Sequence, residues 1–294
     1  MHFFFEICYN MSKITLLIHC QDQKAIIAAI TAYIAGIQGN IIYLDQHVDT
    51  DADVFFMRLE FEVPADKLDI NNLKKDFETK IAIPFNMSWE IYTQHEKLNM
   101  ALFVSKYDHC LYDLLGRYRA HELPLKISVV ISNHKELEHV ALQFGIPFHH
   151  VPFTKEIKTQ AEQEQLALLS QYDVDFIVLA RYMQIITPAI IARYKNKIIN
   201  IHHSFLPAFP GAKPYHSAFK RGVKIIGATS HYVTEELDEG PIIEQDITRV
   251  THSHSIEDFI AKGRDLERTV LARAIQLHAV RKTMVYNNKT IVFL

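Results

Sequence analysis

Residues 99–132 read NMALFVSKYDHCLYDLLGRYRAHELPLKISVVIS and contain two apolar runs separated by a helical pattern. The runs, 99–105 and 126–132, are nearly continuous in apolar residues, which is typical of strands buried on both faces of a parallel sheet. Between them, helical spacing is expected from Asp108 to about Ala120. Because strand, crossover helix and strand form the repeating unit of a doubly wound sheet, this stretch predicts an α/β fold.

The same rhythm continues toward the C-terminus. A third apolar run covers 175–180, and helical patterns are expected over 135–144, 154–172 and about 188–194. A fourth strand is expected at 198–202. The alternation of strands and helices therefore extends the mostly parallel sheet through this part of the chain.

The N-terminal part has a different order of elements. Strand-like and helical patterns follow one another as βαββαβ over residues 13–92, which is the ferredoxin-like split motif. The expected strands are 13–19, 40–48, 54–63 and 84–92, and the expected helices are 25–39 and 65–82. We therefore expect an N-terminal α+β domain over 11–93, a second domain over 94–294, and an extension outside the fold at 1–10.

Composition narrows the class of protein. The 294 residues are 49% hydrophobic and 22% charged with a net charge of −3, which is typical of a folded protein without a basic surface for nucleic acid. No apolar stretch reaches the roughly 18 to 20 residues that span a bilayer. The three cysteines form no CxxC pair, and this favours a reducing cytoplasm. We expect a cytoplasmic protein whose partners are small molecules or copies of itself, not nucleic acid or membrane.

Glycine is scarce, with nine residues in the chain. No GxGxxG motif is present, and the single GxxxxG spacing, Gly222 to Gly227, continues with Ala228 and Thr229 where a phosphate-binding loop needs Lys and Ser or Thr. The sequence therefore disfavours binding of dinucleotides and of ATP.

Polar side chains interrupt the strand expected at 198–202, in the stretch IINIHHSFLPAFPG. Because side chains alternate along a strand, Asn200 and His202 share one face, while Ile199 and Ile201 share the other. Both polar residues stand at the carboxyl end of the strand, where open α/β sheets bind their ligands.

Three interpretations of this pair are open from the residues alone. In the first, Asn200 caps a turn and His202 is an ordinary hydrogen-bonded histidine at the end of a strand. In the second, histidine pairs such as 149–150, 202–203 and 252/254 bind a metal, although no HExxH or comparable spacing supports this.

The third interpretation involves GATSHYVTEELDEGPIIEQ at 227–245, which contains two strand patterns around an acidic turn. If this segment returns beside 198–202, Asp238 can meet His202. Asn, His and Asp together suit attack on a carbonyl, because the imidazole moves a proton, the carboxylate orients it and the amide stabilises an oxyanion. Without an activated Ser or Cys, water or an external amine would be the nucleophile.

Three stretches together resemble the active-site region of the folate-dependent formyl-transfer superfamily: NIHHSFLPAFPG, PYHSAFKRG and HYVTEELDEGPIIEQ. The resemblance implies that Asn200, His202 and Asp238 are the catalytic residues and that no metal is bound. It also implies a folate pocket formed around RYMQIITP and the 234–240 loop, with the substrate-binding residues Arg181, Met183, Gln184, Ile185, Ile186, His203, Thr234, Glu235, Glu236 and Leu237.

Within that superfamily the chain resembles the 10-formyltetrahydrofolate deformylases over nearly its full length. The matching stretches are the 13–92 module, SKYDHCLYDLL at 105–115, and KGRDLERTVLARAIQLHAVRK at 262–282 followed by NNKTIVF. The resemblance implies hydrolysis of 10-formyltetrahydrofolate to formate and tetrahydrofolate without a cofactor. It implies in turn a balance of one-carbon pools and a supply of formate for purine synthesis.

One difference from a related enzyme indicates which molecule accepts the formyl group. The related enzyme that formylates glycinamide ribonucleotide carries a Gly-Ser-Asn phosphate loop after its first strand, where this chain has the bulky residues 105–109. Water is therefore the expected acceptor. The alternatives are a formyltransferase with an amine acceptor, a non-catalytic regulator that binds folate and an amino acid, and a zinc hydrolase.

The N-terminal module resembles ACT domains, which bind small amino acids between copies of the domain. This implies a homo-oligomer, at least a dimer, and an effector such as glycine or methionine. The turn that usually has Gly before the first helix carries Ala25 instead, and its Cβ narrows the space for a ligand.

Overall fold

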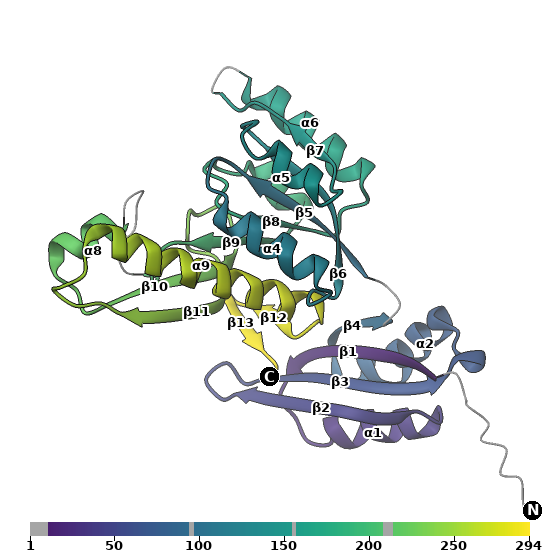
Figure 1. Ribbon diagram of the computed structural model, residues 1–294. Helices are drawn as coiled ribbons and strands as arrows, with labels where there is room; N and C mark the ends of the chain where they lie inside the picture. Colours follow the sequence, from purple (N-terminus) through teal and green to yellow (C-terminus); the bar gives the residue numbers. More distant parts are fainter. Residues whose placement is uncertain (1–10, 94–96, 155–156, 208–213) are drawn as a thin grey trace, which may run out of the picture. The chain divides into compact units, whose positions relative to one another are not determined.

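The computed structural model describes residues 11–93, 97–154, 157–207 and 214–294 (Figure 1). The extension expected at 1–10 therefore lies outside the described residues, as does part of the loop that follows His202. The chain divides into two compact units. One runs up to Glu96 and also contains Phe293–Leu294, and the other comprises Lys97–Val292.

The first unit has the expected βαββαβ order. Its four strands form one antiparallel sheet in the order β2-β3-β1-β4, which confirms the split-motif fold. The elements are β1 (Met11–Gln21), α1 (Ile26–Gly36), β2 (Asn40–Asp49), β3 (Val54–Pro64), a 3₁₀ turn (Ala65–Lys67), α2 (Ile70–Phe77), a π-helical turn (Glu78–Ala82), α3 (Ile83–Phe85) and β4 (Ser88–Thr93).

The second helical segment begins and ends later than the periodicity predicts. It begins after Asp69, whose side chain accepts hydrogen bonds from the backbone N–H groups of Asn71 and Asn72 and so caps α2. The helical backbone then continues through Pro84 to Phe85. The strand expected from residue 84 consequently starts only at Ser88.

The second unit contains a seven-stranded sheet in the order β11-β10-β9-β8-β5-β6-β7. The neighbouring strands β9, β8, β5, β6 and β7 are parallel to one another. Strands β10 and β11 extend the sheet and pair antiparallel. The elements are β5 (Leu98–Val104), α4 (His109–Arg119), β6 (Leu125–Ser132), α5 (Glu138–Gln143), β7 (Phe148–His150), α6 (Lys158–Gln171), β8 (Phe176–Leu179), α7 (Pro188–Arg193), β9 (Ile198–His202), α8 (Pro214–Arg221), β10 (Ile225–Tyr232), β11 (Ile242–Arg249), α9 (Ile256–Ala279), β12 (Thr283–Tyr286) and β13 (Lys289–Val292).

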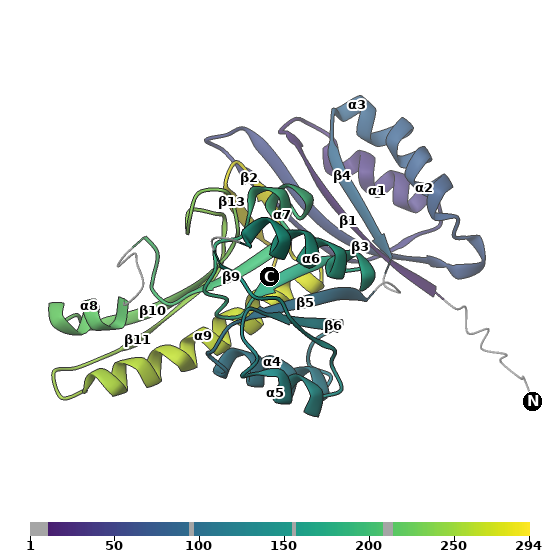
Figure 2. The ribbon, with the colours of Figure 1, turned by 90° about the horizontal axis from the view of Figure 1, so that it is seen from above.

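Helices cover both faces of this sheet. Helices α4, α5 and α9 pack their buried residues with one face, and α6 and α7 with the other (Figure 2). Along β9, Ile199 and Ile201 join the α9 side of the core. The polar residues of β9 consequently point away from α9, as the alternation of side chains requires. This confirms the mostly parallel, doubly wound fold class.

Some elements differ from the sequence-based expectation. The helix expected over 135–144 shortens to α5, because the chain turns first and His134 donates its backbone N–H to Ser132 Oγ. The helix expected over 154–172 is α6, which begins at Lys158. The three-residue strand β7 and the hairpin of β12 and β13 were not expected. Their short runs lack a clear period of two.

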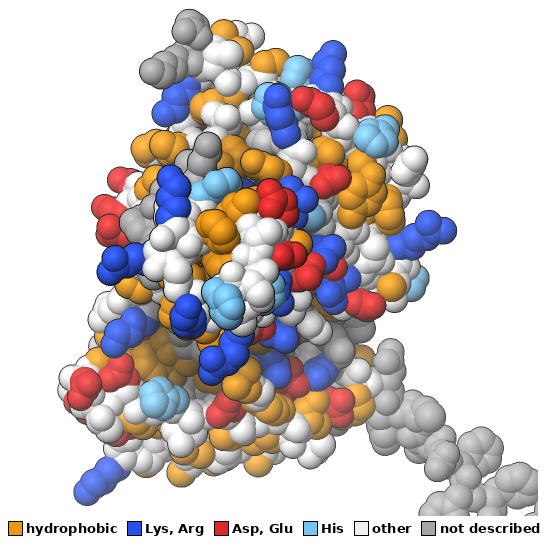
Figure 3. Space-filling view, turned by 60° about the vertical axis from the view of Figure 1, so that its left-hand side comes forward, with side chains coloured by type: hydrophobic (Ala, Val, Ile, Leu, Met, Phe, Trp, Pro, Cys, Tyr) orange, Lys and Arg blue, Asp and Glu red, His pale blue; other side chains and the backbone are white. Residues whose placement is uncertain are grey.

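None of the helices that the structure describes is both long and apolar enough to cross a membrane. On the face drawn in Figure 3, acidic and basic side chains are interspersed with hydrophobic ones among the described residues.

Candidate active site

The adjacent strands β9 and β10 position the first polar side chains. They pair antiparallel, with His231 opposite Asn200 and Thr229 opposite His202. The 227–245 segment, which contains β10, therefore returns beside the 198–202 strand. His202 and His231 are buried, and Asn200 is half-buried.

Asp238 comes from the loop between β10 and β11. Its backbone is left-handed, with a φ of 59°. Two residues later the chain passes so close to β10 that a Cβ on Gly240 would lie 1.7 Å from the carbonyl oxygen of Tyr232. Only glycine fits this approach, which turns the loop back toward the end of β9.

This loop places the Asp238 carboxylate between two imidazoles. His202 Nδ1 lies 3.2 Å from Oδ2, and His231 Nε2 lies 3.6 Å from Oδ1. The hydrogen bond from His202 is the largest of the causes that hold the pKa of the Asp238 carboxyl well below its usual range. Asp238 is therefore a stable carboxylate, and 21% of its side chain remains exposed.

His231 was not identified from the sequence, although it links two of the predicted residues. Its Nδ1 lies 2.9 Å from the carbonyl oxygen of Tyr232, so this nitrogen carries the proton that it donates. In the neutral ring Nε2 is then an acceptor, and Asn200 Nδ2 lies 3.2 Å from it. His231 thereby fixes which way the Asn200 amide points.

The substrate-binding residues expected from the resemblance surround one cavity of about 390 Å³ at the carboxyl edge of the sheet. The structure brings all ten of them to it, together with Asn200, His202 and Asp238. The cavity is also lined by Tyr182, from the expected RYMQIITP stretch, and by residues that were not expected: Leu179, Ile191, Ile201, His231 and Val233. The apolar members of this second group belong to ordinary strand and helix patterns, and such patterns carry no signal of a pocket.

The segment 181–186 forms one wall of the cavity and is held at successive residues. The Tyr182 hydroxyl accepts a hydrogen bond of 3.0 Å from Gln165 Nε2. The backbone N–H of Met183 donates to Ser105 Oγ at 3.1 Å, and this hydroxyl donates to Asn133 Oδ1 at 2.6 Å. A wall fixed by hydrogen bonds is preorganised for a ligand.

His203 and Tyr215 differ in their relation to the cavity. His203 is buried and lines it. Tyr215 lines a neighbouring apolar cavity of about 190 Å³, which His203 also borders. His203 thus lies between Tyr215 and the predicted catalytic residue His202.

The histidine pairs considered as metal ligands do not assemble into a site among the described residues. The only group of three or more potential ligands in that part of the chain is His109, Cys110 and Glu267. His202 instead uses its Nδ1 toward a carboxylate, and its Nε2 is buried without a hydrogen-bond partner in the described structure.

The arrangement suits proton transfer beside a carbonyl group. A carboxylate behind an imidazole fixes the tautomer and favours the charged ring, which leaves the far nitrogen for exchange with a reactant. An amide oriented beside it can donate to negative charge that develops on oxygen.

Comparison with known proteins gives consistent likenesses. The formyl transferase family model matches residues 98–275. A formyltetrahydrofolate deformylase of Synechocystis sp. is 51% identical over 279 residues, covering 95% of this chain and 98% of the relative. The crystal structure of a formyltetrahydrofolate deformylase from Pseudomonas syringae pv. tomato superposes with a TM-score of 0.92 at 44% identity, covering 98% of this chain and 96% of that chain. Glycinamide ribonucleotide transformylase 1 from Symbiobacterium toebii gives a TM-score of 0.64 at 29% identity, covering 69% of this chain and 97% of that chain.

Proposed function

The chain belongs to the formyltetrahydrofolate deformylase family, and we propose that Asn200, His202 and Asp238 are the groups with which it hydrolyses 10-formyltetrahydrofolate to formate and tetrahydrofolate. The observation that carries this assignment is the contact of His202 Nδ1 with Asp238 at the rim of the cavity. The two residues come from separate segments of the chain, and both border the same space.

The reaction proceeds by addition of water and loss of the folate nitrogen. The water oxygen bonds to the formyl carbon while Asp238 orients it and His202 takes up its proton. The Asn200 amide has two N–H groups. One is directed at His231, and the other donates to the developing oxyanion.

The bond between the formyl carbon and N10 then breaks, N10 receives the proton from His202, and formate leaves. No metal or organic cofactor enters this scheme. Formate release should therefore persist in the presence of a strong chelator.

The folate ring system occupies the cavity between the 181–186 wall and the 234–238 loop. The wall provides backbone groups beside apolar side chains such as Ile186, which suits a flat heterocycle with donors and acceptors on its edge. The loop covers the ring system with Leu237, which is 68% exposed.

Water is the acceptor because the segment after β5 leaves no phosphate cradle. Residues 105–109 contain no glycine, and Lys106, Tyr107 and His109 carry bulky side chains. Arg181 lies over the Tyr107 ring at 4.9 Å, and His109 Nε2 lies 2.9 Å from a carboxylate oxygen of Glu267. These contacts fix the segment where the resemblance places the phosphate loop of the transformylases.

The test is to incubate the pure protein with 10-formyltetrahydrofolate and no acceptor and to measure formate. The wild type should release formate, and His202→Asn should lower the rate by about 10²- to 10⁴-fold. His139→Asn, an exposed histidine on α5, is the matched control and should behave as wild type. Formate release only after addition of an amine, or an active H202N, would contradict the assignment.

We further propose that the first unit is an ACT-like module through which the protein forms a homo-oligomer and senses an amino acid. Its edge strand β2 exposes Ile42 and Leu44, and an edge with apolar side chains favours pairing with a second copy. Glycine and methionine are the candidate effectors. Both cysteines that the structure describes, Cys20 and Cys110, are buried and unpaired, which supports a cytoplasmic location.

Two measurements test this role. Light scattering should give at least twice the mass of one chain, and Leu44→Glu with Ile42→Glu on the edge should reduce it. Calorimetry with glycine and with methionine should show heat for one of them. A monomeric wild type contradicts the oligomer, and the absence of heat with either amino acid contradicts the sensor.

A further inference from the structure

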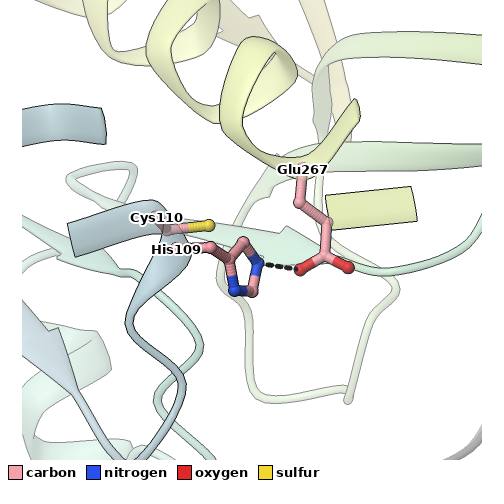
Figure 4. Close-up of side chains that lie close together, drawn as sticks. All are labelled: His109, Cys110 and Glu267. Carbon is pink, nitrogen blue, oxygen red and sulfur yellow. Dashed lines mark hydrogen bonds and ion pairs between the residues drawn. The ribbon is translucent and has the colours of Figure 1, made fainter. Parts of the chain in front are cut away.

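The second unit contains another buried carboxylate, that of Glu267 on α9, with 1% of its side chain exposed. It has no part in the reaction described above. His109 Nε2 lies 2.9 Å from Oε2, and the Tyr215 hydroxyl donates to Oε1 at 2.7 Å. Arg181 Nε lies 3.4 Å from Oε2. In Figure 4 the Glu267 side chain extends from α9, and the imidazole of His109 faces its carboxylate.

This cluster does not suit a metal ion, although Cys110 lies near His109 and Glu267. Both carboxylate oxygens already have donors, and the Arg181 guanidinium would repel a dication. Burial raises the pKa of the Cys110 thiol well above its usual value, whereas metal binding needs the thiolate. The carboxylate therefore serves the side chains that surround it.

Glu267 is ionised in spite of its burial. Desolvation opposes the charged form, but the hydrogen bond from His109 and the charge of Arg181 outweigh it and lower the pKa of the Glu267 carboxyl. A buried charge of this kind holds its partners firmly, because each partner lost leaves part of the charge unsatisfied.

The first of these partners begins the cavity wall. Arg181 has a left-handed backbone with a φ of 63°, and its guanidinium is held between Glu267 and the Tyr107 ring. The next residues along the wall are fixed through Tyr182 and Met183. Glu267 thus anchors the start of the segment that binds substrate.

The second partner leads to the reacting histidine. The Tyr215 ring meets His203 edge-on with centroids 5.9 Å apart, and His203 packs against His202 at 5.3 Å. On α9, one turn before Glu267, a Cβ on Gly263 would lie 2.1 Å from Tyr215 Cζ. The helix therefore provides a fitted place for Tyr215, with room for its ring at Gly263 and an acceptor for its hydroxyl at Glu267.

We propose that Glu267 is a positioning residue for the hydrolysis, fixing the substrate wall through Arg181 and the plane of His202 through Tyr215 and His203. This inference rests on the proposed function, and it assigns two separable effects to one carboxylate. Loss of the Arg181 contact acts on KM, and loss of the Tyr215 contact acts on kcat.

The experiment compares kcat and KM for Glu267→Gln, Tyr215→Phe and the double variant. We expect E267Q to lower kcat/KM by about 10- to 100-fold through both parameters, since hydrogen bonds to a charged group are the stronger kind. Y215F should lower kcat and leave KM unchanged. The loss of kcat in the double variant should be smaller than the product of the two single losses, because E267Q weakens the same hydrogen bond that Y215F removes.

Glu257→Gln, an exposed glutamate in the first turn of the same helix, is the matched control and should behave as wild type. Gly263→Ala is a second route to the same effect. Alanine is the better helix former, yet its Cβ displaces Tyr215, so G263A should also lower kcat without raising KM. The G263A and Y215F pair keeps the test decisive even if E267Q does not fold.

Wild-type kcat and KM in E267Q, or in both Y215F and G263A, would overturn the proposal, and so would multiplicative losses in the double variant. These outcomes are distinct from failure of the proposed function, in which H202N releases formate as fast as the wild type.

Discussion

Two buried histidines, His202 at the end of β9 and His278 near the end of α9, show how the partner of an imidazole decides its use. His202 Nδ1 faces the Asp238 carboxylate at 3.2 Å. His278 Nδ1 lies 2.8 Å from the Tyr232 hydroxyl, which also contacts Thr283 Oγ1 at 2.8 Å. Both rings are buried to a similar degree.

A carboxylate favours the charged form of an imidazole, whereas a hydroxyl group does not offset the loss of water. Burial accordingly lowers the pKa of His278 to about 3, so this ring stays neutral in the folded protein. His202 is placed to carry a proton, and His278 is placed to accept a hydrogen bond within the core. Strand β10 serves both regions, because His231 and Tyr232 point to its opposite faces.

The largest expected effect comes from removing the carboxylate that distinguishes the two regions. Asp238→Asn should lower formate release by about 10³-fold or more, because His202 loses the partner that fixes its proton-bearing nitrogen. Steady-state formate release at saturating substrate measures this. Asp265→Asn, an exposed carboxylate on α9, is the control. A D238N variant that keeps a tenth of the wild-type rate would show that His202 works without it.

A smaller loss is expected at His231, which orients Asn200 beside the same carboxylate. His231→Phe should lower kcat by about 10- to 100-fold, the amount typical of one positioning hydrogen bond to a polar group. His231→Gln, whose side-chain oxygen can accept from Asn200, should recover part of the rate. Equal kcat values for the two variants would contradict this role.

Replacement of the neutral His278 should change the stability of the fold and leave catalysis unchanged. Its pKa in the folded state is below the unfolded value of about 6.5, so the unfolded chain binds the extra proton as the pH falls. This group contributes stability above pH 6.5 and loses it on acidification toward pH 3. At pH 5 the loss amounts to about 2 kcal/mol of the free energy of unfolding.

His278→Asn keeps an acceptor for Tyr232 without the titration. Urea unfolding at pH 7.5, 6 and 5 should show a shallower pH dependence for H278N than for the wild type and for the exposed control H139N. An unchanged slope in H278N would place the titration elsewhere.

The smallest effect should come from a position outside both regions. Ala25 precedes α1 with a φ of 71°, a left-handed conformation that strains a residue with a Cβ. Ala25→Gly should raise the free energy of unfolding by about 0.5–1 kcal/mol and leave formate release unchanged. Thermal unfolding and the formate assay measure this, and a lower melting temperature would contradict it.

The sequence predicts most of the sheet and part of the site, for physical reasons. The alternation in IINIH fixes the shared face of Asn200 and His202, and the acidic turn at 234–240 supplies Asp238. His231 was missed because it is one of several polar residues in an ordinary strand pattern. Only the antiparallel register shows that it stands opposite Asn200.

Glu267 was missed for a different reason. In a helix a glutamate usually points to water, and nothing in the residues around Glu267 indicates that it is buried. Its burial depends on Tyr215 and Arg181, which lie far from it in the sequence. The wall residues 181–186 were identified through resemblance, since backbone groups that bind a ligand leave no pattern of side chains.

The most direct test of the account is hydrolysis in H₂¹⁸O without any added amine, with formate analysed by mass spectrometry. The account predicts that the wild type releases formate carrying one ¹⁸O atom and that H202N releases it only at the background rate. Unlabelled formate, no formate until an amine is added, or labelled formate released by H202N at the wild-type rate would contradict the central claim that His202, held by Asp238, directs water onto the formyl carbon.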